Sequence, residues 1–448
     1  MVSSVKNKIF SFFKEGNDRT IKAKYNILYS LLLKCGGILL SLIIIPLTLD
    51  SLTAYEYGVW LTLSSILVWV NYFDIGLGNG LRNKLAEALA LNNLKLAKAY
   101  VATALFVLGF IVLGIIILFM IINHFIQWDK VLNITDNQIS NIDSIVSIVF
   151  ILFCISFFFK IIGNIYLALQ LPAVNDLLNF LGSFLSFIII YILTKTNSGD
   201  LFGIALAFSL SPVIVYAFSF PVTFHRYKEL RPEWGDIKME YARGLLGLGI
   251  QFFFLQIAVL VIFSTSNFLI SQFFTPAEVT PYNIAFKYFN IVLMFFGILV
   301  SPFWTAITDA YIKKDFLWIK KSLVTMISLW SGCVVLLAMM TLASKHVYAI
   351  WLQDKVDISY SLSFAMAVYM AIATWNQIFI SLINGIGRIK LQLYLGIFEA
   401  VIFVPLAYKL SAMLGLKGIV YAMSFVLFIS AIALPLQSSY ILKTKSLK

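Results

Sequence analysis

Long runs of apolar residues, separated by short polar segments, dominate the chain. A helix needs about 20 apolar residues to cross the hydrocarbon core of a bilayer, and twelve segments come close to or exceed that length. The first six cover about 25–49, 56–74, 100–122, 144–168, 173–194 and 201–223, and the second six cover about 244–272, 281–307, 322–344, 359–384, 391–411 and 417–440. The pattern predicts an all-α polytopic membrane protein with about twelve transmembrane helices.

The composition excludes a soluble protein. Hydrophobic residues make up 61% of the 448 residues and charged residues 12%, and the mean hydropathy is +0.93. A soluble domain has about 45–50% apolar and about 25% charged residues, so lipid must surround most of this chain. The longest connections, about 123–143 and 224–243, are too short for a catalytic domain. The three cysteines lie inside apolar runs without metal-ligand spacing. We expect neither an enzyme, nor a cofactor, nor a bound metal.

Lysine and arginine lie mostly on one side of the predicted membrane. The N-terminus, the loops after even-numbered segments and the C-terminus together hold 24 of the 33 basic residues, whereas the opposite side holds six. Because cytoplasmic loops are enriched in Lys and Arg, we expect both termini in the cytoplasm. On that side lie an amphipathic N-terminal segment (1–24), a linker (224–243) and a tail (441–448). This topology already explains the net charge of +12, so nucleic-acid binding is not expected.

A weak internal repeat divides the chain into halves. The stretch AEALALNNLKLAKAYVATALF, which begins at Ala86, is matched by TDAYIKKDFLWIKKSLVTMIS, which begins at Thr308. Each half holds an even number of predicted helices, and such repeats are parallel and related by an axis along the membrane normal. We therefore predict two parallel six-helix bundles, 25–223 and 244–440, around a central cavity that opens to either side.

Four charged residues lie inside the predicted membrane segments: Lys34, Lys160, Lys287 and Glu399. Each costs on the order of 2.5–3.5 kcal/mol to insert, and such residues normally face the interior of a helix bundle. The excess of lysines predicts an anionic cargo group, for which a diphosphate is one candidate. The alternative is snorkelling or a structural ion pair, which suits Lys160 and Lys287 because their routes to an interface are short. Lys34 lies about 15 Å from the cytoplasmic end of its helix, at 1.5 Å per residue, where snorkelling is harder.

The stretch DIGLGNGLRNK places three glycines after the second apolar segment. Their spacing does not match the dinucleotide fingerprint G-x-G-x-x-G, and they follow a membrane helix instead of a strand. The pattern favours a helix end that packs closely against its neighbours at the cytoplasmic face. Asp74 and Arg82 flank the glycines and are candidates for a cytoplasmic gate. The alternative is a topological stop signal with an exposed ion pair.

A family resemblance rests on this region. PLTLDSLTAYEYGVWLTLSSILVW, followed by DIGLGNGLRNKLAEALA, resembles the N-terminal signature of Wzx-type polysaccharide flippases. These flippases belong to the multidrug/oligosaccharidyl-lipid/polysaccharide exporter superfamily, which also contains the MATE drug exporters and the lipid II flippases. The resemblance implies a MATE-like arrangement of the two bundles. It also implies a multi-pass protein of the bacterial inner membrane that flips an undecaprenyl-diphosphate-linked oligosaccharide for O-antigen or capsule assembly.

The resemblance also implies roles for the buried charges. Lys34 and Lys287 fit the cationic cavity that holds diphosphate and sugars in that family, and Glu399 becomes the candidate for ion coupling. The partners implied are the lipid-linked oligosaccharide, membrane lipids and a polysaccharide polymerase. A MATE-like exporter of cationic drugs is the main alternative, although it predicts an acid-rich cavity. A polymerase or ligase ranks third, because the predicted outer loops are short and nearly devoid of arginine.

Overall fold

A computed structural model describes residues 18–69, 77–134, 139, 141–196, 199–245, 265–388 and 390–446. All regular structure in these residues is helical. Ten helical segments are long and apolar enough to cross a membrane, and they coincide with ten of the twelve predicted segments. The remaining two, 56–74 and 244–272, run partly into residues outside the described ranges. The prediction of an all-α polytopic membrane protein is therefore confirmed.

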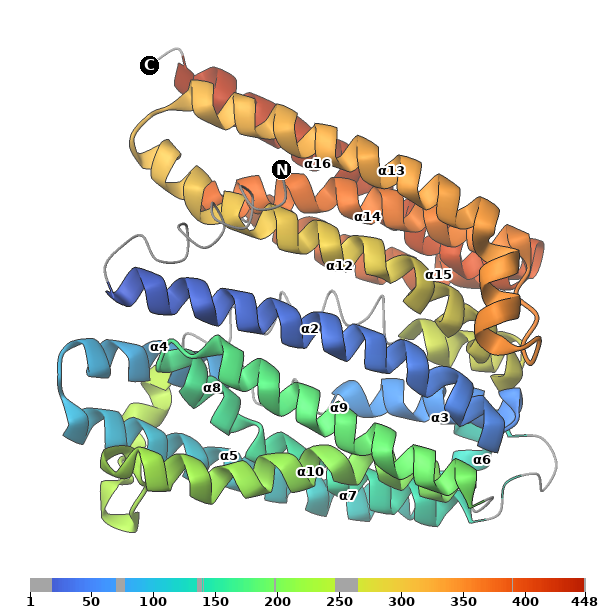
Figure 1. Ribbon diagram of the computed structural model, residues 1–448, viewed down its shortest axis with the longest axis horizontal. Coiled ribbons are helices and arrows are strands. Elements are labelled where there is room, and N and C mark those ends of the chain that lie inside the picture. Colours follow the sequence, from blue (N-terminus) through green and yellow to red (C-terminus); the bar gives the residue numbers. More distant parts are fainter. Residues whose placement is uncertain are drawn as a thin grey trace, which may run out of the picture. The chain divides into compact units, whose positions relative to one another are not determined.

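The helices follow one another along the chain with short connections (Figure 1). In the first half they are α2 (Asp18–Ser51), α3 (Ala54–Leu67), α4 (Leu77–Ala90), α5 (Leu94–Asn123), α6 (Trp128–Val131), α7 (Ile142–Phe159), α8 (Ile161–Ala168), α9 (Pro172–Lys195) and α10 (Leu201–Arg226). Two short 3₁₀ helices follow, η2 (Lys228–Leu230) and η3 (Trp234–Asp236). The second half holds α12 (Pro276–Ile312), α13 (Phe316–Leu352), α14 (Tyr360–Ile386), α15 (Lys390–Leu414) and α16 (Leu416–Ser446).

Polar side chains fix where several helices begin. Asn93 caps α5, Asp200 caps α10 and Asp315 caps α13, each accepting a hydrogen bond from a backbone N–H of the first turn. Such caps satisfy donors that have no partner inside the helix. Gly387 ends α14 with a positive φ of 77°, a conformation that glycine adopts without the steric cost of a Cβ. These signals bound the membrane helices with loops of only a few residues.

The chain forms two compact units. Unit 1 comprises Met1–Leu52, Leu67–Asp129 and Asn137–Phe254. Within it α9 packs against both α2 and α10, α10 also packs against α7, and α4 packs against α5 and α8 (Figure 1). Leucines and alanines of α4 and α5 form the centre of its hydrophobic core with α7, α8 and α10. The predicted segment 144–168 is broken at Lys160, between α7 and α8.

Unit 2 comprises Leu255–Lys448 with two segments from the first half, Thr53–Ile66 and Lys130–Asp136. Its central helix is α14, which packs against α12, α13 and α16. Helix α3 packs so closely on the start of α12 that a Cβ on Gly58 would lie 1.7 Å from the carbonyl oxygen of Pro276. The boundaries of the bundles predicted over 25–223 and 244–440 stay a prediction.

Candidate functional site

Lys34 forms an ion pair inside unit 1. It lies on α2, and its Nζ is 3.6 Å from Oδ2 of Asp176 on α9. Ser30 also donates a hydrogen bond to the Asp176 carboxylate. Residues four apart share one face of a helix, so Ser30 and Lys34 meet the same acid. The Lys34 side chain remains 52% exposed, whereas that of Asp176 is 14% exposed. The cation therefore has a counterion and still offers part of its surface to another anion.

The first two turns of α9 extend this site with amide side chains. The hydroxyl of Tyr216, on α10, donates to Oδ1 of Asn179 over 2.9 Å. The Asn179 amide donates to the carbonyl of Asn175 over 3.1 Å. The Asn175 amide lies against Gly163 of α8, where a Cβ would be 2.2 Å from its Oδ1. Four helices, α2, α8, α9 and α10, thus contribute to one polar region, which we call the α9 polar site.

The sequence reasoning missed Asp176. It lies only a few residues inside the predicted segment 173–194, close enough to the end to pass as an interfacial charge. A signal was available, because the first and fifth predicted segments both begin on the cytoplasmic side. An acid near the start of the fifth segment is therefore a natural partner for a lysine in the first.

Lys160 occupies the break between α7 and α8. Its backbone N–H donates to the Ser156 carbonyl, and its own carbonyl accepts from the N–H of Gly163. The side chain is half-buried, and it forms no ion pair with any other residue that the structure describes. The structure therefore places Lys160 at a helix junction and does not join it to the Lys34–Asp176 pair.

Unit 2 holds the other two predicted site residues. Glu399, on α15, is only 5% exposed, and Ser430 on α16 donates a hydrogen bond to its Oε1. Lys287, on α12, is half-buried beside the buried rings of Tyr288 and Phe289. Within the described ranges neither Lys287 nor Glu399 forms an ion pair, so the structure does not bring them together.

The predicted gate is described only in part. Asp74 lies outside the described residues, and Arg82 is exposed on α4. On the same helix Lys84 pairs with Glu87 at 2.8 Å, and this hydrogen bond raises the pKa of Lys84. Gly80 packs against the backbone of Leu245, where a Cβ would lie 2.0 Å from the carbonyl oxygen. Close packing thus explains this glycine, while the gate itself stays a prediction.

Comparison with known proteins places this geometry in a class. No family model matches the chain. Two curated relatives, both named "Putative O-antigen transporter", match most of it. The Salmonella typhi protein is 22% identical over 392 residues, which cover 85% of this chain and 88% of that protein. The Salmonella typhimurium protein is 23% identical over 390 residues, which cover 81% and 84% respectively.

Solved transporter structures share the fold. An inward-facing MATE family multidrug resistance transporter of the MOP superfamily matches with a TM-score of 0.76 at 15% identity, over 94% of this chain and 99% of its own. The lipid II flippase MurJ, in an inward closed conformation, matches with a TM-score of 0.72 at 12% identity, over 92% and 87%. The chain is therefore a multi-pass membrane protein with the fold of MOP-superfamily transporters.

Within that class both sequence relatives have the name "Putative O-antigen transporter", and the MurJ flippase is a structural neighbour. The resemblance to Wzx-type polysaccharide flippases is confirmed. The described residues contain no group of three or more His, Cys, Asp or Glu side chains that could hold a metal ion.

Proposed function

We propose that the protein flips an undecaprenyl-diphosphate-linked oligosaccharide across the bacterial inner membrane by alternating access, with both termini cytoplasmic, to supply O-antigen or capsule assembly. Three findings support the proposal: the names of the sequence relatives, the MurJ-like fold, and the partly accessible Lys34 at the α9 polar site. The observation that carries it is the Lys34–Asp176 pair. A membrane-embedded cation already held by one carboxylate can exchange that carboxylate for a stronger anion.

The proposed binding step is an exchange of counterions. A diphosphate carries more negative charge than the single carboxylate of Asp176, so its attraction to the Lys34 ammonium is stronger at equal distance. Ser30 remains as a donor to Asp176 when the lysine turns to the cargo. The exposed amide of Asn179, which accepts a hydrogen bond from the buried Tyr216 hydroxyl, provides a polar contact suited to a sugar or phosphate oxygen.

The other charged residues take supporting roles in this proposal. Lys287 and Lys160 add positive charge along the path of the head group. Glu399 couples transport to an ion gradient, since a buried carboxyl with a hydroxyl donor can bind and release a small cation. Asp74 and Arg82 close the cytoplasmic side. A polysaccharide polymerase receives the flipped product on the outer face.

Complementation of a flippase-null strain tests the proposal. Lys34→Ala is expected to abolish surface polysaccharide and to leave lipid-linked repeat units on the cytoplasmic leaflet, whereas Lys34→Arg retains activity. Lys195→Ala is the matched control, because Lys195 is the exposed basic residue at the far end of the α9 helix that holds Asp176. Wild-type activity of a Lys34→Ala, Lys287→Ala double variant would reject the cavity assignment.

The fold itself favours a second candidate, a MATE-like cation-coupled exporter of drugs. Asp176 and Glu399 supply two acids inside membrane helices for such a cargo. Overexpression distinguishes the two functions, because raised resistance to organic cations without restored polysaccharide would favour the exporter.

A further inference from the structure

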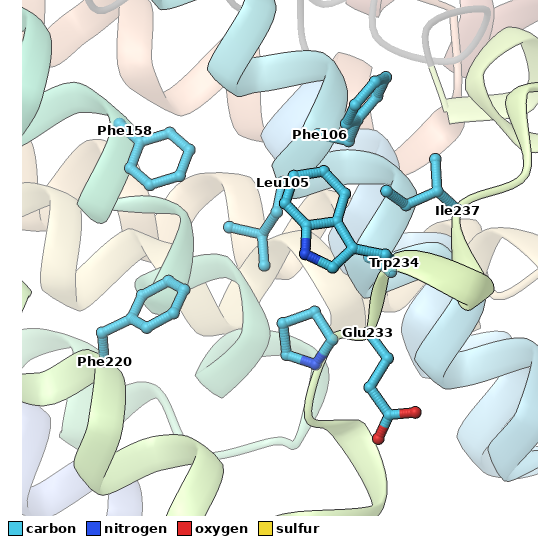
Figure 2. Close-up of a pocket in the computed structure, with 9 residues that line it drawn as sticks. Leu105, Phe106, Phe158, Phe220, Glu233, Trp234 and Ile237 are labelled. Carbon is cyan, nitrogen blue, oxygen red and sulfur yellow. The ribbon is translucent and has the colours of Figure 1, made fainter.

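An apolar pocket lies in unit 1, and none of its lining residues belongs to the α9 polar site. Its volume is about 310 Å³, and it is a broadly open depression in the surface. Its lining comes from α5, α7, α10 and the segment after α10: Ala102, Leu105, Phe106, Phe158, Phe220, Pro232, Glu233, Trp234 and Ile237. Figure 2 shows Phe158 and Phe220 on one side of the space and Leu105 and Trp234 across from them. Ligand pockets in proteins begin at about this size.

Residues 228–238 form one wall of the pocket, and we call this segment the strap. Ion pairs and hydrogen bonds hold it against α5. Lys98 of α5 contacts Glu233 at 2.9 Å and Asp236 at 3.0 Å. The backbone N–H of Lys238 donates to the Thr103 hydroxyl at 3.0 Å, and that hydroxyl donates to the Lys238 carbonyl. These contacts hold the strap against α5 from Glu233 to Lys238. The wall of the pocket is therefore fixed by specific interactions of the fold.

The chemistry of the walls selects a hydrocarbon ligand. Eight of the nine lining residues are apolar, and four of these are aromatic. The ninth is Glu233, whose carboxylate points away from the space in Figure 2 and is held by Lys98. Apart from the indole N–H of Trp234, the side chains of the lining turn no charged or hydrogen-bonding group inward to a sugar or an organic cation. Burial of apolar surface is the interaction that such walls offer.

Exposed aromatic side chains lie in and near the lining of the pocket. Trp234 is 84% exposed at its rim, and Phe218 on α10, outside the lining, is 73% exposed. Exposed aromatic side chains at the end of a membrane helix are typical of the interface between hydrocarbon and head groups. A chain that lies in the bilayer can therefore reach the pocket without crossing water.

Basic side chains surround the same end of α10. Arg226, Lys228, Arg231 and Lys238 are all exposed there, with Glu229 and Glu240 among them. The two other acids of the strap, Glu233 and Asp236, are held by Lys98. Together with Lys98 these are five basic and four acidic side chains, so positive charge exceeds negative by one next to an apolar pocket. A hydrocarbon chain with an anionic head group suits this arrangement.

We propose that this pocket binds the head-group end of the polyprenyl chain while the diphosphate rests on the basic residues of the strap, before the head group reaches Lys34. The proposal rests on the proposed function and names a loading site for the same cargo. A diphosphate is favoured over a phospholipid because its higher charge gains more from several basic side chains.

The test is photolabelling of the purified full chain in phosphatidylcholine nanodiscs with a diazirine-bearing geranylgeranyl diphosphate. Labelled peptides are expected from α5, α7, α10 and the strap. Trp234→Ala should lower this labelling about tenfold, since it removes one large apolar contact. Trp318→Ala is the matched control, an exposed tryptophan near the start of α13, and should leave labelling unchanged. Ala102→Leu, checked for a wild-type unfolding temperature, fills the pocket and should also reduce labelling.

The competitors distinguish the possible sources of the chain. Unlabelled geranylgeranyl diphosphate should displace the probe, whereas phosphatidylglycerol at the same mole fraction should not. Equal displacement by phosphatidylglycerol would make the pocket a general lipid site and overturn the proposal. The proposal would also be overturned if labelling were spread evenly over lipid-facing helices, or if Trp234→Ala were labelled as strongly as the wild type. If the wild type flips the cargo in proteoliposomes without labelling in the pocket, the loading site falls and the proposed function stands. If the pocket is labelled but the wild type does not flip the cargo, the proposed function falls, and the pocket stays a binding site for a polyprenyl diphosphate without a role in loading.

Discussion

Two charged sites in the molecule follow opposite designs. In unit 1 the cation Lys34 has an acid partner and is half exposed, whereas in unit 2 the acid Glu399 is buried and accepts a hydrogen bond from the Ser430 hydroxyl. The first arrangement suits a large anion that approaches from outside and replaces a weak counterion. The second cannot contact a large cargo in this conformation, because Glu399 is almost fully enclosed. Under the proposed function, the difference implies that the main cargo contact at Lys34 and ion coupling at Glu399 are separable.

The largest expected effect comes from removing the cation. In Lys34→Ala, flipping of the lipid-linked oligosaccharide in proteoliposomes should fall on the order of 100-fold, since removing one partner of a desolvated charge pair costs about 2–5 kcal/mol and about 1.4 kcal/mol is tenfold. The response to an imposed ion gradient should persist in the residual activity. Loss of gradient response together with flipping would show that the two sites act as one.

The next effect comes from neutralising the acid of unit 2. Glu399→Gln keeps the shape and the contact with Ser430, and it should lower gradient-driven flipping about tenfold, the result of losing about 1.4 kcal/mol of coupling. Exchange without a gradient should continue, and binding of the cargo should be unchanged. Rates of flipping with and without a pH or sodium gradient measure this. A parallel loss in both conditions would contradict a role confined to coupling.

A smaller and opposite effect is expected at the partner of Lys34. Asp176→Asn removes the competing anion and keeps an acceptor for Ser30, so cargo affinity should rise about fivefold, as expected for about 1 kcal/mol from a partly exposed ion pair. Titration with an oligosaccharide diphosphate lipid in nanodiscs measures it. Weaker binding would mean that Asp176 contacts the cargo directly.

The smallest effect is expected at Lys84, which lies outside both charged sites and serves as a control. Lys84→Gln removes an exposed helix pair with Glu87, and the free energy of unfolding should change by no more than about 0.5 kcal/mol. Flipping should stay at the wild-type rate in the same proteoliposome assay. A transport defect in this variant would mean that Lys84 takes part in the cycle together with the predicted gate residue Arg82 on the same helix.

The fold was accessible from sequence, because lipid imposes a simple rule on it. Long apolar runs must become helices where no water satisfies the backbone, and the ten described spans lie where the runs predicted them. The break at Lys160 could not be predicted in this way, since no proline marks it. It accompanies the close approach of Asn175 to Gly163, a contact between helices that hydropathy does not encode.

Only part of the candidate site could be predicted from the sequence, for a related reason. Lys34 and Glu399 stand out as single charges in apolar runs. Their partners do not, because serine is common in membrane helices and Asp176 lies near a helix end. Which face of α16 presents Ser430 to α15 depends on how the two helices pack. Pairing is a property of three-dimensional register, and a single sequence contains no measure of it.

Helix α3 belongs to unit 2 although the chain reaches it before most of unit 1. Its glycine at position 58 sits against Pro276, and the Thr280 hydroxyl donates to the carbonyl of Ala54. Recombination between two related genes at the midpoint would therefore pair an α3 from one parent with an α12 from the other. Chimeras that move Thr53–Ile66 together with the second half keep this contact intact, and they are the natural way to exchange units between flippases of different glycans.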